Sequence, residues 1–237
     1  DGPLFLWAHF NDPHLPHIGG YEAELRRLDR AVGRVLAAAR PDTIVVIFSD
    51  HGESFGAHGH RGHIWRLDEE LVRVVIGVWG PGVPRRRPRW PTSLIDIAPT
   101  LTELLGLPTP AGWQGRSLLR EPAPRAIVFE SEYKGQLDLR GIRFGDHKIT
   151  LDRRQGVYEL YNVVEDPDDR HNLVGERPEL FARMKARLGR VFDAQYNDRR
   201  LQRKLRLLRG RAITMPRHLG PLLPGQSTGS APRGPRK

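Results

Sequence analysis

Apolar residues follow two different patterns in the first fifty positions of the chain. Residues 4–9 and 43–48 are apolar at most positions, which is typical of strands buried in a parallel sheet. Between these runs, apolar residues recur every three or four positions from Tyr21 to Ala39, and Pro41 follows. This spacing predicts an amphipathic helix. Strand, helix and strand in this order predict a crossover unit of an α/β sheet.

The next elements continue the alternation of strands and helices. A run at residues 74–79 predicts a third strand, and residues 80–91 predict a surface loop that is basic and interrupted by prolines. Ser93 is a suitable N-terminal cap for a helix that ends near Leu105, where Gly106 closes it. This part of the chain therefore has the pattern of an α/β domain.

The pattern changes beyond Pro122 to short runs in which apolar and polar residues alternate. Four such runs predict the strands of a small antiparallel sheet, at residues 126–130, 139–144, 148–151 and 157–161. A terminal helix is predicted from Pro178 to about Val191, because proline is favoured in a first turn. We therefore expect three parts: an α/β domain (residues 1–121), a subdomain of sheet and helix (122–197) and a basic, largely disordered tail (198–237).

The composition limits the kinds of chemistry that the chain can carry. It has no cysteine, which excludes disulfides, thiolate zinc sites and a cysteine nucleophile within these 237 residues and leaves the compartment open, cytoplasm or periplasm. No apolar run reaches the roughly 18 residues that a membrane span needs. Residues 199–237 hold eleven Lys and Arg and no acid, so this tail either contacts an anionic surface or only adds solubility.

The strongest local signal is Asp50-His51-Gly52, directly after the predicted strand at residues 43–48. Ligands of α/β sheets bind at the carboxyl ends of the strands. A carboxylate oxygen and an imidazole nitrogen are both suitable metal ligands, and glycine permits a sharp turn beside them. The pair is equally consistent with a simple capping turn.

Six of the ten histidines fall in two loops, at the ends of two predicted strands: His14, His17, His51, His58, His60 and His63. If the two strands are neighbours, the loops converge on one pocket in which imidazoles hold an anionic, oxygen-rich group. The alternatives are a solvent-exposed histidine-rich loop and a structural zinc site.

An ordered set of motifs over residues 3–193 resembles the carboxyl-terminal half of a sulfatase, in the alkaline-phosphatase-like superfamily of metal-dependent sulfate and phosphate ester hydrolases. The motifs lie at residues 3–16, 28–33, 48–59, 80–83, 93–106, 115–119, 159–162 and 165–173. The resemblance implies an α/β fold with an alkaline-phosphatase-like mixed sheet flanked by helices, present in part, followed by a small antiparallel subdomain and a terminal helix.

The resemblance also implies roles for individual residues. Asp50 and His51 would be metal ligands, His14 would hydrogen-bond the ester oxygens, and His63 would contact the leaving-group side of the ester. His58 would line the pocket for substrate or brace its loop. The family implies one divalent ion, usually calcium, but an imidazole ligand leaves manganese, magnesium and zinc open. No family role is assigned to three other histidines, His9, His17 and His60, while Asp96 and Pro99 are expected to be scaffold.

The family's nucleophile, a formylglycine made within a Cys/Ser-x-Pro-x-Arg motif, is not found in this chain. Ser230-Ala231-Pro232-Arg233 places its arginine one position too early. In the family the motif and two more metal-binding carboxylates belong to the amino-terminal half, so we expect that half to be missing and the chain to be inactive alone.

The expected function is therefore that of a sulfatase-like, metal-dependent hydrolase whose substrate is a small-molecule or glycan sulfate ester. One alternative is a phosphodiesterase or phosphonate monoester hydrolase of the same superfamily. Another is a non-catalytic fragment whose basic tail binds nucleic acid or an anionic surface.

Overall fold

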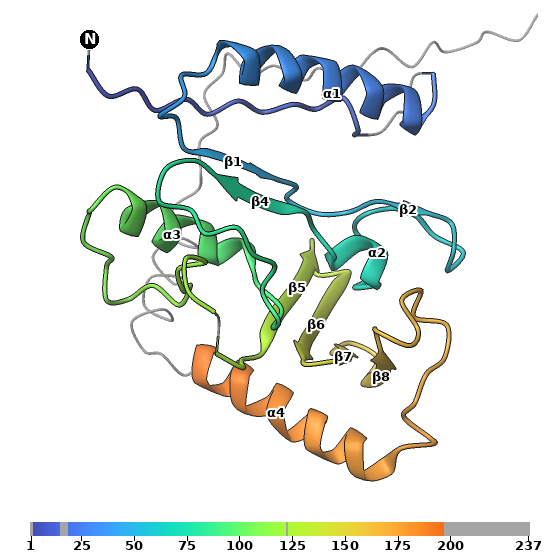
Figure 1. Ribbon diagram of the computed structural model, residues 1–237. Coiled ribbons are helices and arrows are strands. Elements are labelled where there is room, and N and C mark those ends of the chain that lie inside the picture. The colour runs from blue at the N-terminus through green and yellow to red at the C-terminus, as the bar shows by residue number, and fades with distance from the viewer. Residues whose placement is uncertain (1, 15–18, 122, 197–237) are drawn as a thin grey trace, which may run out of the picture. The chain divides into compact units, whose positions relative to one another are not determined.

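The computed structural model describes residues 2–14, 19–121 and 123–196. Contacts divide the chain into two compact units, residues 1–191 and 192–237, and the packing described below belongs to the first. The predicted tail, residues 198–237, lies outside the described residues, and the domain boundary at residue 121 stays a prediction. The structure is mixed α/β with small antiparallel sheets and helices, which confirms the expected fold class (Figure 1).

The first helix forms where the apolar spacing predicts it. Helix α1 spans Tyr21–Ala38, and its last backbone bond runs from the N–H of Ala39 to the carbonyl of Leu36. Leu28 and Leu36 lie on the half-buried face, while most of the remaining surface is exposed. The helix ends here because proline at position 41 cannot continue it.

Strands β1 (Val45–Phe48) and β4 (Ile76–Trp79) form where they are expected, but they pair antiparallel. The expectation that this sheet is parallel is therefore wrong for the pair. After β1 the chain turns back through β2 (Ser54–Phe55), β3 (Arg61–Gly62) and the short helix α2 (Glu69–Val72). Strand β4 consequently starts beside the carboxyl end of β1.

Residues 4–9 do not form the predicted buried strand. The segment has no strand pairing, and its apolar side chains are exposed, from 87% at Leu4 to 64% at Trp7. The ring of Trp7 still packs edge-on against Phe48, with the ring centroids 5.5 Å apart. An apolar run forms a strand only where a neighbouring edge accepts its hydrogen bonds, and no strand in the described part of the chain does so.

The capped helix after the basic loop is confirmed. Ser93 and Asp96 form a capping box around the 3₁₀ turn η1 (Leu94–Asp96), which leads into α3 (Ile97–Leu104). Gly106 then ends the helix with a positive φ of 65°. The Asp96 carboxylate is buried and also accepts the backbone N–H of Arg116, so this residue is scaffold.

The four alternating runs form one antiparallel sheet, as predicted, and its strands are arranged in sequence order. Its strands are β5 (Ile127–Tyr133), β6 (Leu137–Phe144), β7 (His147–Asp152) and β8 (Val157–Asn162). Ile142, Ile149 and Leu160 are fully buried and form its core. The last helix, α4, spans Pro178–Tyr196 and buries Met184 and Leu188. No helix in the described part of the chain has both the length and the apolar character that crossing a membrane requires.

A buried ion cluster fastens this sheet to α2. Lys148 of β7 has no exposed surface, and its ammonium donates to the carbonyl of Leu67 (3.0 Å) and to the carboxylate of Asp169. The same ammonium lies 3.5 Å from the carboxylate of Glu69. Burial raises the pKa of Asp169, and the neighbouring Lys148 opposes that shift. The cluster thereby fixes the chain segment that follows His63.

Candidate active site

The turn after β1 arranges the side chains of Asp50 and His51 toward each other. The His51 Nδ1 lies 2.7 Å from the carbonyl oxygen of Gly52, and because a carbonyl only accepts, Nδ1 must carry the hydrogen. In the neutral ring Nε2 is then an acceptor, and it lies 3.7 Å from Oδ2 of Asp50. The Asp50 carboxylate is 76% exposed. Two acceptors that face each other at this distance are suited to share a cation.

Glycine is required at position 52 because the backbone of α2 approaches it closely. A Cβ there would lie 1.9 Å from the carbonyl oxygen of Glu70. The N–H of Gly52 donates to the carbonyl of Leu71 at 2.8 Å. This bond anchors the Asp50–His51 turn to α2, so the two candidate ligands sit on a fixed backbone.

His63 brings the second loop onto the first. Its ring stacks on His51 with centroids 4.2 Å apart, and the ring of His14 meets it edge-on at 5.1 Å. The three histidines come from separate segments: His14 precedes α1, His51 follows β1, and His63 follows β3. We call His14, His51 and His63 the histidine cluster.

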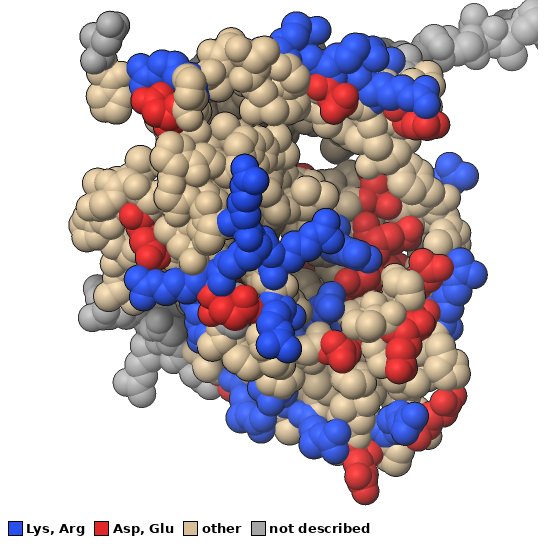
Figure 2. All heavy atoms as spheres, viewed as in Figure 1, with Lys and Arg blue, Asp and Glu red and all other residues tan. Residues whose placement is uncertain are grey.

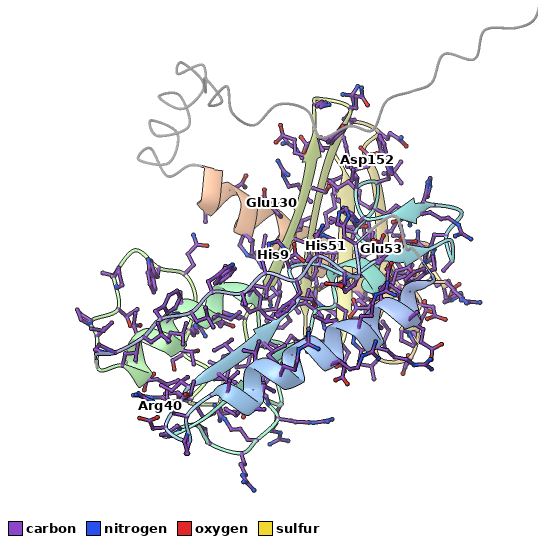
Figure 3. The ribbon with its side chains drawn as sticks, turned by 90° about the horizontal axis from the view of Figure 1, so that it is seen from above. His9, Arg40, His51, Glu53, Glu130 and Asp152 are labelled. Atoms are coloured by element: carbon purple, nitrogen blue, oxygen red, sulfur yellow. The ribbon has the colours of Figure 1, made fainter. Side chains whose placement is uncertain are left out.

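Glu53 contacts this cluster, although no sequence motif predicts a role for it. Its side chain is only 7% exposed, and Oε2 accepts a hydrogen bond from Nδ1 of His63 at 3.3 Å. The other oxygen, Oε1, is buried and has no hydrogen-bond partner within the described part of the chain. Glu53 and His51 follow β1 closely (Figure 3). The available signal was a carboxylate two positions after His51 in a loop expected to form a pocket.

The structure places the other histidines elsewhere. Nε2 of His58 donates to the carbonyl of Asp168 at 2.8 Å, which braces the β2–β3 hairpin against the loop after β8. Among the described residues no ring contact joins His58 to the histidine cluster, and its substrate-binding role stays a prediction. His9 is exposed, His60 contributes a backbone carbonyl to Ser54, and His17 lies outside the described residues.

Asp50 and His51 supply some, but not all, of the ligands that a divalent cation needs. The facing atoms of Asp50 and His51 supply one oxygen and one nitrogen ligand, and the hydrogen bond at Nδ1 fixes the ring as metal-binding histidines require. Within the described ranges no group of three or more His, Asp or Glu side chains could hold a metal. The pair is therefore at most an incomplete ligand set.

Known proteins that resemble this chain are mainly sulfatases. The Sulfatase family model matches residues 1–107. The chain is 29% identical over 188 residues to the uncharacterized sulfatase YidJ of Escherichia coli, covering 72% of the chain and 38% of that protein. It is also 29% identical to the Delta 4,5-hexuronate-2-O-sulfatase of Bacteroides thetaiotaomicron, covering 70% and 39%. The family model covers less than half of this chain, and over those residues the chain is similar to the sulfatase family.

Solved structures show the same fold. A putative sulfatase from Bacteroides thetaiotaomicron superposes with a TM-score of 0.64 at 25% identity, over 76% of this chain and 43% of that one. A phosphonate monoester hydrolase from Silicibacter pomeroyi superposes with a TM-score of 0.52 at 19% identity, over 78% and 39%. The chain spans about two fifths of the length of the curated relatives it matches.

Proposed function

We propose that this chain supplies one half of the active site of a metal-dependent sulfate ester hydrolase. The observation that carries the proposal is the histidine cluster beside Asp50, assembled from three segments at positions that match sulfatase motifs. Similarity of residues 1–107 to the Sulfatase family model supports the reaction class. The roles of the individual residues are part of the proposal.

Asp50 and His51 would hold the divalent ion through Oδ2 and Nε2. When bound, such an ion supplies positive charge that polarises the ester oxygens. Calcium is expected from the family, while the imidazole of His51 suits manganese or zinc and magnesium is also open. The remaining ligands would come from outside the described residues.

His63 and His14 would act on the ester itself. Nδ1 of His63 donates to Glu53, which leaves Nε2 for the leaving-group oxygen. With the ring protonated at both nitrogens, the Nε2–H would give its proton to this oxygen as the ester bond breaks, and the ring would become neutral. His14, at the edge of the same ring, would hydrogen-bond the sulfate oxygens and stabilise their charge. Both groups would act on a substrate positioned by the ion.

The attacking group would come from a segment outside these 237 residues. The chain has no cysteine, and the segment at residues 230–233 lacks the spacing of a formylglycine motif. We therefore expect the isolated chain to show no esterase activity. The substrate would be a small-molecule or glycan sulfate ester.

The test is to express the chain together with whatever its gene encodes upstream, and to assay 4-nitrophenyl sulfate beside 4-nitrophenyl phosphate and a phenylphosphonate ester. Preferential hydrolysis of the sulfate, lost in His63→Ala and retained in the surface control Arg30→Ala, would support the proposal. Hydrolysis of none of the three esters would reject it.

A phosphoryl or phosphonyl ester is the second candidate substrate. The phosphonate monoester hydrolase with the same fold supports it, as does 28% identity to the multifunctional alkaline phosphatase superfamily protein PehA of Trinickia caryophylli. Preference for either phosphorus ester in the same assay would select this candidate.

A further inference from the structure

Five arginines and no acidic residue lie in the segment from residue 71 to residue 95. Four of them, Arg85, Arg86, Arg87 and Arg89, belong to the loop between β4 and η1, which we call the arginine loop (residues 84–91). Lys and Arg side chains gather near the middle of the face on which this loop runs (Figure 2). The arginine loop therefore carries a net positive charge, whereas the chain without its basic tail has nearly equal numbers of acidic and basic residues.

The arginine loop is held in place on one side and open on the other. The guanidinium of Arg86 donates to the carbonyl of Leu118 (2.8 Å), and Glu121 accepts the backbone N–H of Arg89 (2.8 Å). The half-buried ring of Trp90 packs against Phe144 of β6, with the centroids 6.1 Å apart. These contacts, and three prolines that fix φ at positions 84, 88 and 91, give the loop a defined course.

The side chains of Arg85, Arg87 and Arg89 are exposed and have no ion pair or hydrogen bond with any residue that the structure describes. Only Arg86 is compensated within the loop, by Glu121 at 3.4 Å. Three guanidinium groups on a fixed backbone offer paired donors that match the oxygens of sulfate or phosphate groups.

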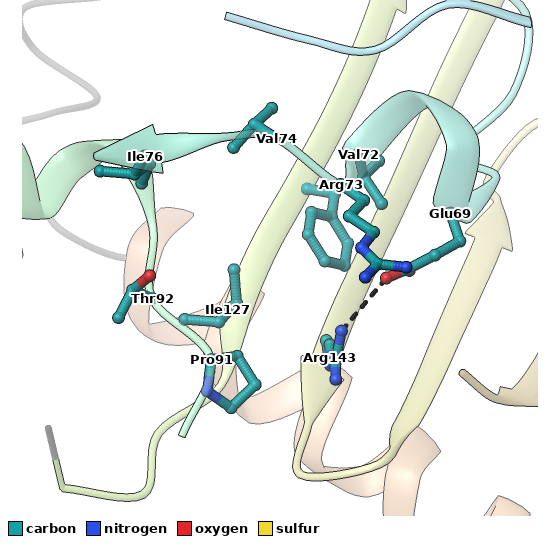
Figure 4. A pocket seen from close by; sticks show the side chains of 10 residues that line it. Glu69, Val72, Arg73, Val74, Ile76, Pro91, Thr92, Ile127 and Arg143 are labelled. Atoms are coloured by element: carbon teal, nitrogen blue, oxygen red, sulfur yellow. Dashed lines mark hydrogen bonds and ion pairs between the residues drawn. The ribbon is translucent and has the colours of Figure 1, made fainter. Parts of the chain in front are cut away.

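A hollow of about 240 Å³ adjoins the end of the loop. Pro91 and Thr92 form part of its wall, and Arg73 and Arg143 extend to it from the end of α2 and from β6 (Figure 4). The only carboxylate in the wall, Glu69, is already paired with Arg143 at 3.1 Å and lies 3.5 Å from the ammonium of Lys148. The guanidinium of Arg73 has no partner among the described residues, so the hollow is suited to an anionic group.

The hollow and the histidine cluster share one short stretch of backbone. The carbonyls of Leu71 and Val75 accept hydrogen bonds from Gly52 and Ser49, on either side of Asp50. Between them, Arg73 lines the hollow. A ligand that fills the hollow beside Arg73 therefore contacts the segment that supports the candidate active site.

We propose that the arginine loop and the hollow form a binding surface for a linear sulfated glycan, separate from the reaction centre. Sulfate groups along the glycan would pair with Arg85, Arg87 and Arg89, and one sulfate group would enter the hollow beside Arg73. A nucleic acid is disfavoured because single-stranded ligands use exposed aromatic rings for base stacking, and Trp90 is packed against Phe144. The choice of glycan rests on the proposed function.

Binding of the full chain to heparin, a sulfated glycan probe, tests this surface. The variant R85A/R87A/R89A is compared with R26A/R30A/R34A, which removes three exposed arginines from α1, and both keep residues 198–237 unchanged. We expect the loop variant to weaken heparin binding about tenfold or more in 0.1 M salt, with a salt-dependence slope lower by about two to three, and the α1 variant to change it less than about twofold. R73A should weaken binding on its own.

Equal losses of heparin affinity in the two triple variants would show an effect of net charge alone and would overturn the proposal. An unchanged heparin affinity in the loop variant would also overturn it. Stronger retention on single-stranded DNA than on heparin would assign the surface to nucleic acid instead. Because binding requires no catalysis, failure here leaves the hydrolase proposal intact. Conversely, heparin binding in a protein that cleaves no ester would leave the surface standing.

Discussion

His63 donates through Nδ1 to a carboxylate that water scarcely reaches: Oε2 of Glu53 lies 3.3 Å away, and the side chain of Glu53 is 7% exposed. A buried carboxylate beside an imidazole fixes both its tautomer and its orientation. Glu53 thus sets which nitrogen of His63 carries the hydrogen.

Glu53→Ala should release the ring of His63 while leaving the fold largely intact. We expect ¹⁵N NMR of the chain to show loss of the single Nδ1–H tautomer of His63, because its acceptor is gone. Esterase activity of the complete protein should fall by about 10–100-fold, the range that carboxylate partners of histidine contribute in metal sites. Glu53→Gln, whose amide oxygen also accepts, should keep the tautomer. An unchanged tautomer in the alanine variant would remove Glu53 from the site.

Asp50→Asn should weaken binding of a divalent cation, since it removes the charged half of the ligand pair. Water-proton relaxation with Mn²⁺ should show weak binding to the chain, as expected for an incomplete ligand set, and about tenfold weaker binding in the variant. Asp42→Asn is the matched control, because that carboxylate pairs with Arg40 at a distant, exposed site. If both variants bind Mn²⁺ as the unchanged chain does, the cation is held elsewhere.

Gly52→Ala should destabilise the fold through a steric clash. The added Cβ would lie 1.9 Å from the carbonyl oxygen of Glu70, so the backbone of either the turn or α2 must move. We expect the free energy of unfolding, measured with urea, to fall by about 2–3 kcal/mol. Gly33→Ala in α1 meets no atom within 4 Å and should instead raise it by about 0.5–1 kcal/mol. Similar free energies of unfolding for the two variants would contradict the close approach of the Glu70 carbonyl oxygen to position 52.

Lys148→Met should be strongly destabilising because it leaves the buried carboxylate of Asp169 without its cation, while Glu69 keeps its ion pair with Arg143. Removing one partner of a buried ion pair costs about 3–5 kcal/mol, against less than about 1 kcal/mol for an exposed pair. Arg26→Ala, which breaks an exposed pair with Glu22, is the control. Thermal unfolding of both variants provides the comparison. A loss below about 1 kcal/mol in the methionine variant would mean that water reaches the cluster.

The helices and strands could be predicted because each has its own apolar periodicity or its own residues that begin or end it. Apolar spacing located α1, alternation located β5 to β8, and Ser93 with Gly106 marked the ends of the η1–α3 turn and helix. The grouping of His14 with the β1 and β3 loops was predictable from family motifs. Burial of Glu53 was not, because a carboxylate in a polar loop carries no sequence signal of the backbone that will cover it.

The sequence by itself determined where the helices and the antiparallel strands lie and which residues carry the candidate chemistry, because these depend on neighbouring positions. The tertiary structure decided the direction of β4 against β1, the exposure of residues 4–9, and the contact between Glu53 and His63. It also decided which arginines of the loop are compensated. Each of these depends on a partner distant in sequence, and hydrophobic periodicity contains no information about such partners.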